Sequence, residues 1–451
     1  MPSPELDVLS VVENSELSAG CFAMPPTPST QHSELSTWLH HLESLHPKTI
    51  ELGLERVVAV RRRLQLHAAF SIVTIGGTNG KGSTCAMLES MLRAAGYRVG
   101  LYTSPHLLHY NERVRLDGAQ ASDAALCAAF AAVEAGRGDI PLTYFEFGTL
   151  AALWLFEREK IDVAILEVGL GGRLDAVNAF DADCAIVTSV AIDHIDYLGE
   201  TRAAIGHEKA GIFRSDRPAI CAEADAPQSV AHHAAQVGAR FLQIGRDFGF
   251  DAEQEQWRFW SGNQHYDALP YPALRGAYQL NNAAAALAAL EQLKQRLPVT
   301  RNEIRRGLLE VSLPGRFQVL PGKPQVVLDV AHNPHAAAAL AGNLAAMPPA
   351  GRTIAVFAML RDKDIAGVVQ ALSATIDLWL VAGIDQPRGA GSGELLAVLR
   401  GQGLAARALP FADVVAAYRH ACNMAGDDDR IAAFGSFYTV ADVLRERRIE
   451  F

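Results

Sequence analysis

The chain has 451 residues, more than one typical domain contains, so we expect two or three domains that each bury a core. Its composition, 49% hydrophobic and 20% charged, is typical of a globular protein, and no apolar run approaches the roughly 18 residues needed to cross a bilayer. A formal net charge of -10 argues against a protein whose main ligand is a nucleic-acid backbone, so any phosphate site has to be local.

The N-terminal segment lacks the features of a secretory signal. Its first 23 residues contain acidic residues but no Lys, Arg or His. Signals for folding begin only near Ser36, so we interpret residues 1–31 as a disordered extension, with residues 1–23 alternatively the product of an upstream start codon. The six cysteines have no C-x-x-C spacing, which indicates neither a zinc site nor a disulfide framework. We therefore expect a cytoplasmic protein with reduced thiols.

A glycine-rich turn joins a predicted strand at 70–75 to a predicted helix at 85–92. Its glycines let consecutive N–H groups converge on phosphate oxygens at the start of a helix, and Lys81 supplies a point charge. The match to G-x-x-x-x-G-K-[ST] is imperfect, because Ile75 replaces the first glycine and Gly82 replaces the hydroxyl residue. A glycine-rich turn without a ligand stays the alternative. The candidate nucleotide-binding residues are Thr78, Asn79, Gly80, Lys81, Gly82 and Ser83.

Two short segments downstream combine polar groups with proline or aromatic residues. Ser104 precedes Pro105, so its hydroxyl is either a ligand for Mg²⁺ or the N-cap of a helix. Residues 143–147 place aromatic rings and polar groups at the start of a helix, a composition that suits a flat ring with polar edges. Packing in the core is the alternative for those rings.

Two predicted strands end at candidate functional residues, as expected for ligand clefts at the carboxyl edge of a sheet. The strand at 163–167 ends at Glu167, where an unpaired carboxylate would be costly. A cation therefore has to lie nearby, either Mg²⁺ bound to ATP or a base such as Arg173. The strand at 185–189 is followed by the polar run 193–199.

From about residue 70, β-rich runs alternate with Ala- and Leu-rich helical runs, which predicts an α/β fold with a parallel sheet flanked by helices. We expect a P-loop ATPase-type N-terminal domain over residues 32–312 and a smaller, Rossmann-like C-terminal α/β domain over residues 325–451. The segment 313–324 is rich in helix breakers and is predicted to be the linker and hinge. The aromatic-rich segment 241–271 predicts a small antiparallel excursion.

The form G-T-N-G-K-G-S at 77–83 resembles the Mur ligase superfamily, and in particular its folylpolyglutamate synthase branch. Further segments resemble that branch in order and spacing from Trp38 to Phe437; they lie at 46–56, 103–115, 143–147, 167–176, 193–199, 208–212, 279–283, 328–334 and 434–437. The resemblance implies a bifunctional, ATP-dependent amide ligase. It would add L-glutamate to dihydropteroate and to reduced folates through an acyl phosphate, as a monomer with no nucleic-acid or membrane partner.

The resemblance also implies a catalytic centre with ATP and two Mg²⁺ ions. It assigns Ser104, Glu167 and His194 as metal ligands, with Lys81 on the phosphates. Lys209 would join them if CO₂ carbamylates its amine, which converts a cation into an oxygen-bearing anion. From the sequence alone, Lys209 would be an exposed helix lysine, and His is an uncommon ligand for magnesium.

The remaining site residues follow from the same resemblance. Asn282 would meet the adenine, Arg316 the phosphates and Asp329 the ribose, although Arg316 in an interdomain ion pair would look the same. His332 and Ser436 are the candidates for holding the incoming glutamate. The pterin side would be formed by Glu51, Leu52, Gly53, Thr143, Tyr144, Phe145, Glu146, Leu174, Asp175 and Ala176, although 46–56 also reads as a helix entry with a solvated face.

Two other functions compete with a folate ligase. A muropeptide ligase of the same superfamily would share the glycine loop and the metal residues, but the segments at 46–56 and 143–147 argue against it. A nucleotide-dependent switch protein would not need the motif that contains Asp329 and His332.

Overall fold

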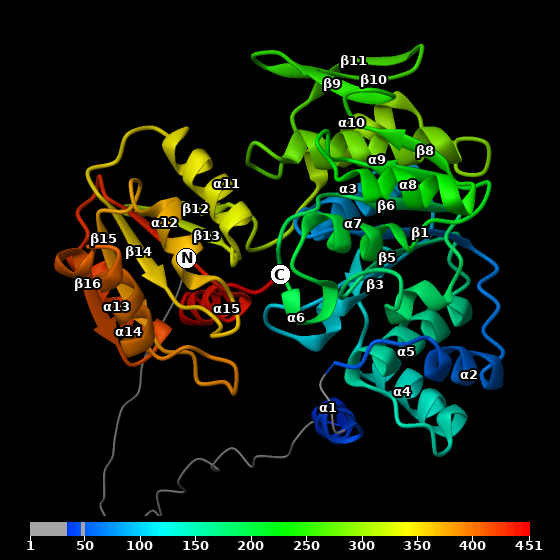
Figure 1. The fold of residues 1–451 in the computed structure, drawn as a ribbon, viewed down its shortest axis with the longest axis horizontal. Helices are drawn as coiled ribbons and strands as arrows, with labels where there is room; N and C mark the ends of the chain where they lie inside the picture. The colour runs from blue at the N-terminus through cyan, green and yellow to red at the C-terminus, as the bar shows by residue number, and fades with distance from the viewer. Residues whose placement is uncertain (1–33, 47–49) are drawn as a thin grey trace, which may run out of the picture.

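The computed structural model describes residues 34–46 and 50–451, which form two α/β domains side by side (Figure 1). The predicted extension at 1–31 lies outside the described residues. Within the described part of the chain, no helix combines the length and the apolar composition that a membrane span requires.

The N-terminal domain is built on an eight-stranded sheet with the order β4-β3-β2-β5-β1-β6-β7-β8. The central strands β5, β1 and β6 are parallel and buried along their whole length, because helices cover both faces. Only β3 and β4 run antiparallel to their neighbours. The strands are β1 Ser71–Gly76, β2 Val99–Tyr102, β3 Val114–Leu116, β4 Ala119–Gln120, β5 Val163–Glu167, β6 Cys184–Val187, β7 Pro218–Cys221 and β8 Arg240–Gln243.

Alternate residues of β1 enter two different cores, since side chains alternate across a strand. Val73 packs against the first layer, formed by α3 Lys81–Ala94, α9 Gln279–Leu293 and α10 Arg301–Glu310. Ile72 packs against the second layer on the opposite face. That layer contains α1 Glu34–Ser44, α2 Glu55–Arg63, α4 Asp123–Arg137, α5 Tyr144–Arg158, α7 Arg202–Ala210 and α8 Gln228–Val237; shorter turns are η1 Tyr110–Arg113, η2 Ala176–Ala179 and α6 Ile195–Leu198.

The predicted antiparallel excursion is confirmed as the sheet β9 Phe248–Ala252, β10 Gln256–Ser261 and β11 Gln264–Pro270 (Figure 1). Its start differs from the prediction, because residues 241–243 belong to β8 at the edge of the main sheet. Trp257 and Phe259 of β10 are fully buried against the α3 and α9 layer. The aromatic residues of this segment therefore anchor the small sheet to the domain.

The C-terminal domain has a six-stranded sheet with the order β12-β13-β17-β14-β15-β16. One face carries α11 Pro334–Ala345, α12 Ile365–Leu372 and α13 Ser392–Gly401, and the other carries α14 Val414–Met424 and α15 Phe437–Glu446. The strands are β12 Gln318–Leu320, β13 Gln325–Asp329, β14 Thr353–Phe357, β15 Leu378–Ala382, β16 Ala408–Phe411 and β17 Arg430–Phe434, with a short turn η3 Ala405–Arg407.

The predicted linker 313–324 contains secondary structure. Its residues 318–320 form β12, which pairs antiparallel with β13 at the edge of the C-terminal sheet. The backbone of β12 is therefore hydrogen-bonded to the C-terminal domain, and the connection that carries no helix or strand spans 311–317.

A loop of the N-terminal domain reaches into the C-terminal domain. Leu107 is only 8% exposed and packs with Leu328, Val330 and Val440 of the C-terminal core. The same loop is bound together by Glu112, whose carboxylate accepts from the backbone N–H groups of residues 107–109 at 2.6 to 2.7 Å. The two domains thus share a packed contact beside the linker.

Candidate active site

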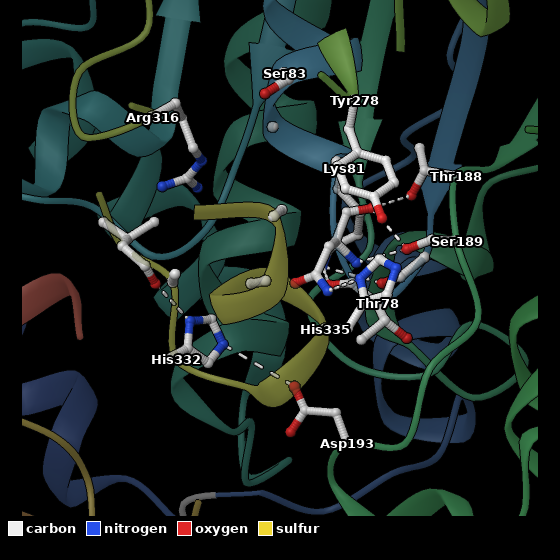
Figure 2. A pocket seen from close by; sticks show the side chains of 18 of the residues that line it. Thr78, Lys81, Ser83, Thr188, Ser189, Asp193, Tyr278, Arg316, His332 and His335 are labelled. Carbon is white, nitrogen blue, oxygen red and sulfur yellow. Dashed lines mark hydrogen bonds and ion pairs between the residues drawn. The ribbon is translucent and has the colours of Figure 1, made fainter. Parts of the chain in front are cut away.

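A cavity of about 740 Å³ lies between the two domains. Its walls come from the carboxyl ends of β1, β5 and β6 in one domain and of β13 and β17 in the other. Figure 2 shows side chains of both domains pointing toward one another there. The predicted nucleotide and metal residues all line this one cavity.

The glycine loop connects β1 to α3 as predicted. Gly80 has φ 89°, and a Cβ on it would lie 2.5 Å from Oδ1 of Asn282. Gly77 has φ 145° and contacts Thr188 so closely that no side chain fits. Lys81 donates to the carbonyls of Gly77 and Thr78 at 3.1 and 3.4 Å, so its ammonium lies within the loop (Figure 2).

Asn79 ties the glycine loop to both domains. Its carbonyl accepts from the hydroxyls of Thr188 and Ser189 at 2.7 and 3.0 Å. Its side-chain amide forms a reciprocal pair with Asn333 of the C-terminal domain, at 3.1 and 3.2 Å. Asn333 also caps α11 by accepting from the N–H of Ala336. The phosphate loop is therefore directly bonded to the start of a helix in the other domain.

Glu167 and Ser104 meet at the start of α3. The backbone N–H of Ser104 donates to Glu167 Oε2 at 3.2 Å. Burial raises the pKa of Glu167, and the charges of Lys81 and Arg316 oppose that effect. Arg173, the alternative partner for this carboxylate, instead pairs with Glu208 at 2.9 Å. A carboxylate that is 5% exposed and lies near the cations Lys81 and Arg316 fits a metal ion in this position.

No group of three or more His, Cys, Asp or Glu side chains at metal-ligand spacing occurs in the described ranges. Magnesium usually takes only one or two protein carboxylates and fills its octahedron with water and substrate phosphates. The sparse set formed by Ser104 and Glu167 is consistent with an ion that is completed by nucleotide phosphates.

Lys209 is buried on α7, with 4% of its surface exposed, whereas the sequence alone indicates an exposed helix lysine. Burial lowers the pKa of its ammonium to about 7, and repulsion by Lys81 adds to the shift. A lysine with this pKa is partly neutral near pH 7, and only a neutral amine can attack CO₂. The carbamylation of this lysine stays a prediction.

His194 lies in a turn that the C-terminal domain contacts. Its φ of 52° places it in the left-handed region, and burial lowers its pKa to about 4. Lys363 Nζ lies 3.2 Å from His194 Nε2 and 2.7 Å from Asp193 Oδ1. His332 Nε2 is 4.0 Å from the other oxygen of Asp193 (Figure 2). Asp193 is thus the centre of a cluster drawn from both domains.

Arg316 and Asp329 line the cavity from the C-terminal side. The guanidinium of Arg316 stacks 5.0 Å above the ring of Phe437. Among the described residues Arg316 forms no ion pair with an acid, so the interdomain pair is not observed, and its Nη1 donates to the carbonyl of Gly315 at 3.5 Å. The two Asp329 oxygens accept backbone N–H groups, those of Phe317 at 2.8 Å and Ala331 at 2.7 Å. The other donors of Arg316 are left available to an anion in the cavity.

The other predicted nucleotide and glutamate residues also reach the cavity wall. Asn282 bonds to the side chain of Gln279 at 3.0 Å. His332 Nδ1 lies 2.8 Å from the carbonyl of Val330, and burial lowers its pKa to about 4. Ser436 caps α15 by accepting from the N–H of Thr439 at 3.0 Å.

The predicted pterin segments come together one layer behind the cavity wall. The N–H of Gly53 donates to the carbonyl of Leu174 at 3.3 Å. Arg56 bridges Glu51 at 3.2 Å and Glu146 at 2.9 Å. Glu146 and Thr143 also form a capping box at the start of α5. Two residues of the predicted pterin site therefore also cap this helix.

Several contacts connect these segments to residues of the cavity wall. Arg113 stacks over the ring of Tyr144 at 5.4 Å. Asp175 accepts from the N–H of Leu170 at 2.8 Å, and burial raises the pKa of Asp175 to about 7. Phe145 lies 5.7 Å from Tyr102 and directly against Gly169. Leu52 and Ala176 belong to the same group, Ala176 as the first residue of η2.

Sequence reasoning missed the residues that complete the site across the domains, namely Asp193, Lys363, Asn333, Tyr278 and His335. Asp193 follows a buried strand and Asn333 stands next to the candidate His332, and these positions could have marked both residues. Lys363 lies in a charged run after β14, which looks like an ordinary solvated turn. Tyr278 and His335 stack at 5.4 Å beside the glycine loop (Figure 2).

Comparison with known proteins gives concordant matches. A Mur ligase middle domain model matches residues 75–290, and a "Mur ligase, glutamate ligase domain" model matches residues 315–437. The dihydrofolate synthase/folylpolyglutamate synthase of Escherichia coli (strain K12) is 49% identical over 413 residues, which cover 91% of this chain and 95% of that protein.

Two solved structures are similar along nearly their whole length. E. coli FolC in complex with DHPP and ADP has a TM-score of 0.88 and 47% identity, covering 93% of this chain and 99% of that one. A bifunctional folylpolyglutamate synthase/dihydrofolate synthase with Mn, AMPPNP and L-glutamate bound has a TM-score of 0.86 and 49% identity, with coverage of 93% and 99%.

Proposed function

We propose how the residues of this cavity carry out the reaction of the family to which the chain belongs. That family is the Mur ligase family, in its dihydrofolate synthase/folylpolyglutamate synthase branch. The chain is an ATP-dependent ligase that joins L-glutamate to dihydropteroate and to folyl-glutamates. The observation that carries the residue roles is the convergence of the glycine loop, Glu167 and the buried Lys209 with Arg316 of the other domain on one cavity.

We assign the phosphates of ATP to the glycine loop, Lys81 and Arg316. The loop N–H groups and both cations lie where negative charge has to be held, and Asn282 and Asp329 lie where the adenosine would extend. Ser104, Glu167 and His194 would hold Mg²⁺, with Lys209 as a fourth ligand when carbamylated. The bound ions supply charge neutralisation at the phosphoryl group.

The chemical obstacle is that a carboxylate has no good leaving group. Transfer of the γ-phosphoryl group to the substrate carboxylate gives an acyl phosphate, and the amine of L-glutamate then attacks its carbonyl and releases phosphate. Lys81 and Arg316 stabilise the charge that moves onto the transferred group. His332 and Ser436 are placed to hold the incoming glutamate on the C-terminal side.

The acyl phosphate has to be kept from water, and the two-domain cavity provides for that. Contacts of Lys363, Asn333 and Leu107 join the two domains beside the site. Closure over bound substrates would exclude water while the amine enters. Since both walls come from one chain, we expect the enzyme to act as a monomer, and in the cytoplasm where ATP is available.

The pterin is assigned to the segments 51–53, 143–146 and 174–176. Their mutual contacts place aromatic rings and carboxylates next to Arg113, Gly169 and Leu170 of the cavity wall. A pocket there requires only that these side chains separate from one another as the ring enters.

The test is ADP release by the purified chain with dihydropteroate or tetrahydrofolate, each with and without L-glutamate. We expect release that needs both the pteridine and glutamate. Release that needs glutamate alone would refute the folate assignment, and release that needs neither would favour a nucleotide switch. Mass spectrometry of the intact chain equilibrated with bicarbonate, against a Lys209→Met variant, tests the carbamate as a labile addition of CO₂.

A further inference from the structure

A second group of residues lines the cavity besides those assigned to the nucleotide, and we call the space beside them a lobe. Its C-terminal wall is formed by Arg388, Tyr438 and Arg445, and its N-terminal wall by His106 and Arg113. Tyr438 and Arg445 belong to α15, which lies on the side of its domain that faces the N-terminal domain (Figure 1). The proposed roles of ATP, metal and glutamate use none of these five residues.

The arginines of this lobe are held in place on rigid elements. Tyr438 and Arg445 are seven residues apart on α15, so they share one helix face. Arg388 lies in a turn after β15, where its carbonyl accepts from the N–H of Arg361 at 2.8 Å. Asp362 accepts from Nε and Nη2 of Arg388 at 3.0 and 2.5 Å, an arrangement that leaves Nη1 available to a ligand.

Two of the three arginines of this lobe are ion-paired, Arg388 with Asp362 and Arg445 with Asp442 at 2.8 Å, so Arg113 supplies its excess positive charge. Arg113 donates to His106 Nδ1 at 2.9 Å and has no acidic partner among the described residues. Burial and the charges of Arg113 and Arg445 lower the pKa of His106 to about 3, so this imidazole is neutral. In contrast, the acids Glu223 and Asp225 line the nucleotide end of the cavity. The charge distribution therefore favours an anion at the α15 end.

The reaction requires a place for an anion of variable length. The carboxylate that reacts has to meet the γ-phosphoryl group in every cycle, whether the substrate carries no glutamate or several. Dihydropteroate brings no further carboxylate, whereas every glutamate of a folate substrate, the terminal one included, adds an α-carboxylate. Those charges have to lie in the cleft beside the reaction centre, paired or in water.

We propose that the "arginine lobe", defined by Arg388, Tyr438 and Arg445, binds the γ-glutamyl tail of folate substrates through its α-carboxylates. This inference rests on the proposed function and concerns only substrates that already carry glutamate. The planar guanidinium forks match carboxylates in geometry, and Tyr438, 43% exposed, offers a ring and a hydroxyl between them. The lobe thus distinguishes glutamylated substrates from dihydropteroate.

The size of the effect follows from exposure. The side chains of Arg388 and Arg445 are 50% and 55% exposed, so water and salt screen each contact. An exposed charge pair changes affinity by a few-fold, roughly fivefold at most. Two such contacts on a triglutamate give a difference that steady-state kinetics resolves.

The experiment compares KM for tetrahydropteroyl-triglutamate with KM for dihydropteroate in the full chain and in the variants Arg388→Gln, Arg445→Gln and the double variant. The matched control is Arg361→Gln, because Arg361 is a neighbouring arginine that pairs with Glu394 and is 56% exposed. We expect the ratio of the two KM values to rise a few-fold, at most roughly fivefold, per lost arginine, to return toward normal in Arg388→Lys, and to stay constant in the control.

Other outcomes separate the two levels of the inference. An unchanged ratio in the double variant, or a ratio that changes equally in Arg361→Gln, would overturn the arginine lobe and leave the ligase assignment intact. Absence of glutamate-dependent ADP release from the unaltered chain with either substrate would refute the proposed function and this inference together. Circular dichroism melting of each variant confirms that the comparison is made on folded protein.

Discussion

Replacement of Gly80 by alanine tests whether the glycine loop is shaped by its approach to Asn282. The position has φ 89°, where an L-residue costs about 1–2 kcal/mol relative to glycine. In addition, the new Cβ would lie 2.5 Å from Oδ1 of Asn282, so the amide or the loop has to move. We expect Gly80→Ala to lose stability and also to raise the KM for ATP at least tenfold, because the loop N–H groups no longer converge.

The chain offers a matched control for the backbone term. Gly96, just after α3, has φ 87°, but a Cβ there meets nothing within 4 Å. Gly96→Ala should lose the same 1–2 kcal/mol in urea denaturation while its KM for ATP stays normal. If Gly80→Ala bound ATP as tightly as Gly96→Ala, the close approach to Asn282 would have no role in the nucleotide site.

Three further changes test other parts of the site. Glu167→Gln should keep the fold, since a neutral amide suits a buried site. It should lower kcat at least 100-fold and weaken the response of activity to Mg²⁺. Activity near normal would exclude Glu167 from the metal site. Asn333→Ala removes a helix cap, so it should lower the free energy of unfolding by about 1 kcal/mol and also slow the ligase reaction. Asp364→Ala removes the cap of α12 outside the cavity and should lower stability alone. Equal activity in the two variants would argue against a role for the Asn79–Asn333 contact. The pKa of Asp175 is raised to about 7, so between about pH 4 and 7 the folded state binds a proton that the unfolded state has lost, and folding stability should fall as the pH rises through that range. Asp175→Asn should flatten this dependence of stability on pH in urea titrations. An unchanged slope would contradict the burial of a protonated carboxyl.

The parts of the fold that local patterns specify were predictable. The strand at 163–167 has the predicted bounds, because a short run of apolar residues bounded by turns marks a buried parallel strand. The glycine loop was equally clear, since only glycine adopts the required angles beside a helix start. These features depend on neighbours in the sequence.

Features that depend on distant partners were not predictable. Lys209 looks like a surface lysine, but α7 packs against distant segments such as Gly172 and the side chain is 4% exposed. Lys363 lies 170 residues from Asp193, and no local pattern marks their contact at 2.7 Å. The strand β12 was missed because its breaker-rich sequence predicts a linker, whereas pairing with β13 supplies the hydrogen bonds that its local sequence does not favour.

The burial of Leu107 affects how this protein can be recombined with its relatives. The leucine belongs to the N-terminal domain, but its side chain packs in the core of the C-terminal domain. A chimera that exchanges the C-terminal domain at residues 311–317 would keep Leu107 but surround it with the core of another protein. Ser104 stands three residues before that leucine, so a poor fit would reach the proposed metal site as well as the core. Compatible chimeras therefore need to take the loop at 104–109 from the same parent as the C-terminal domain.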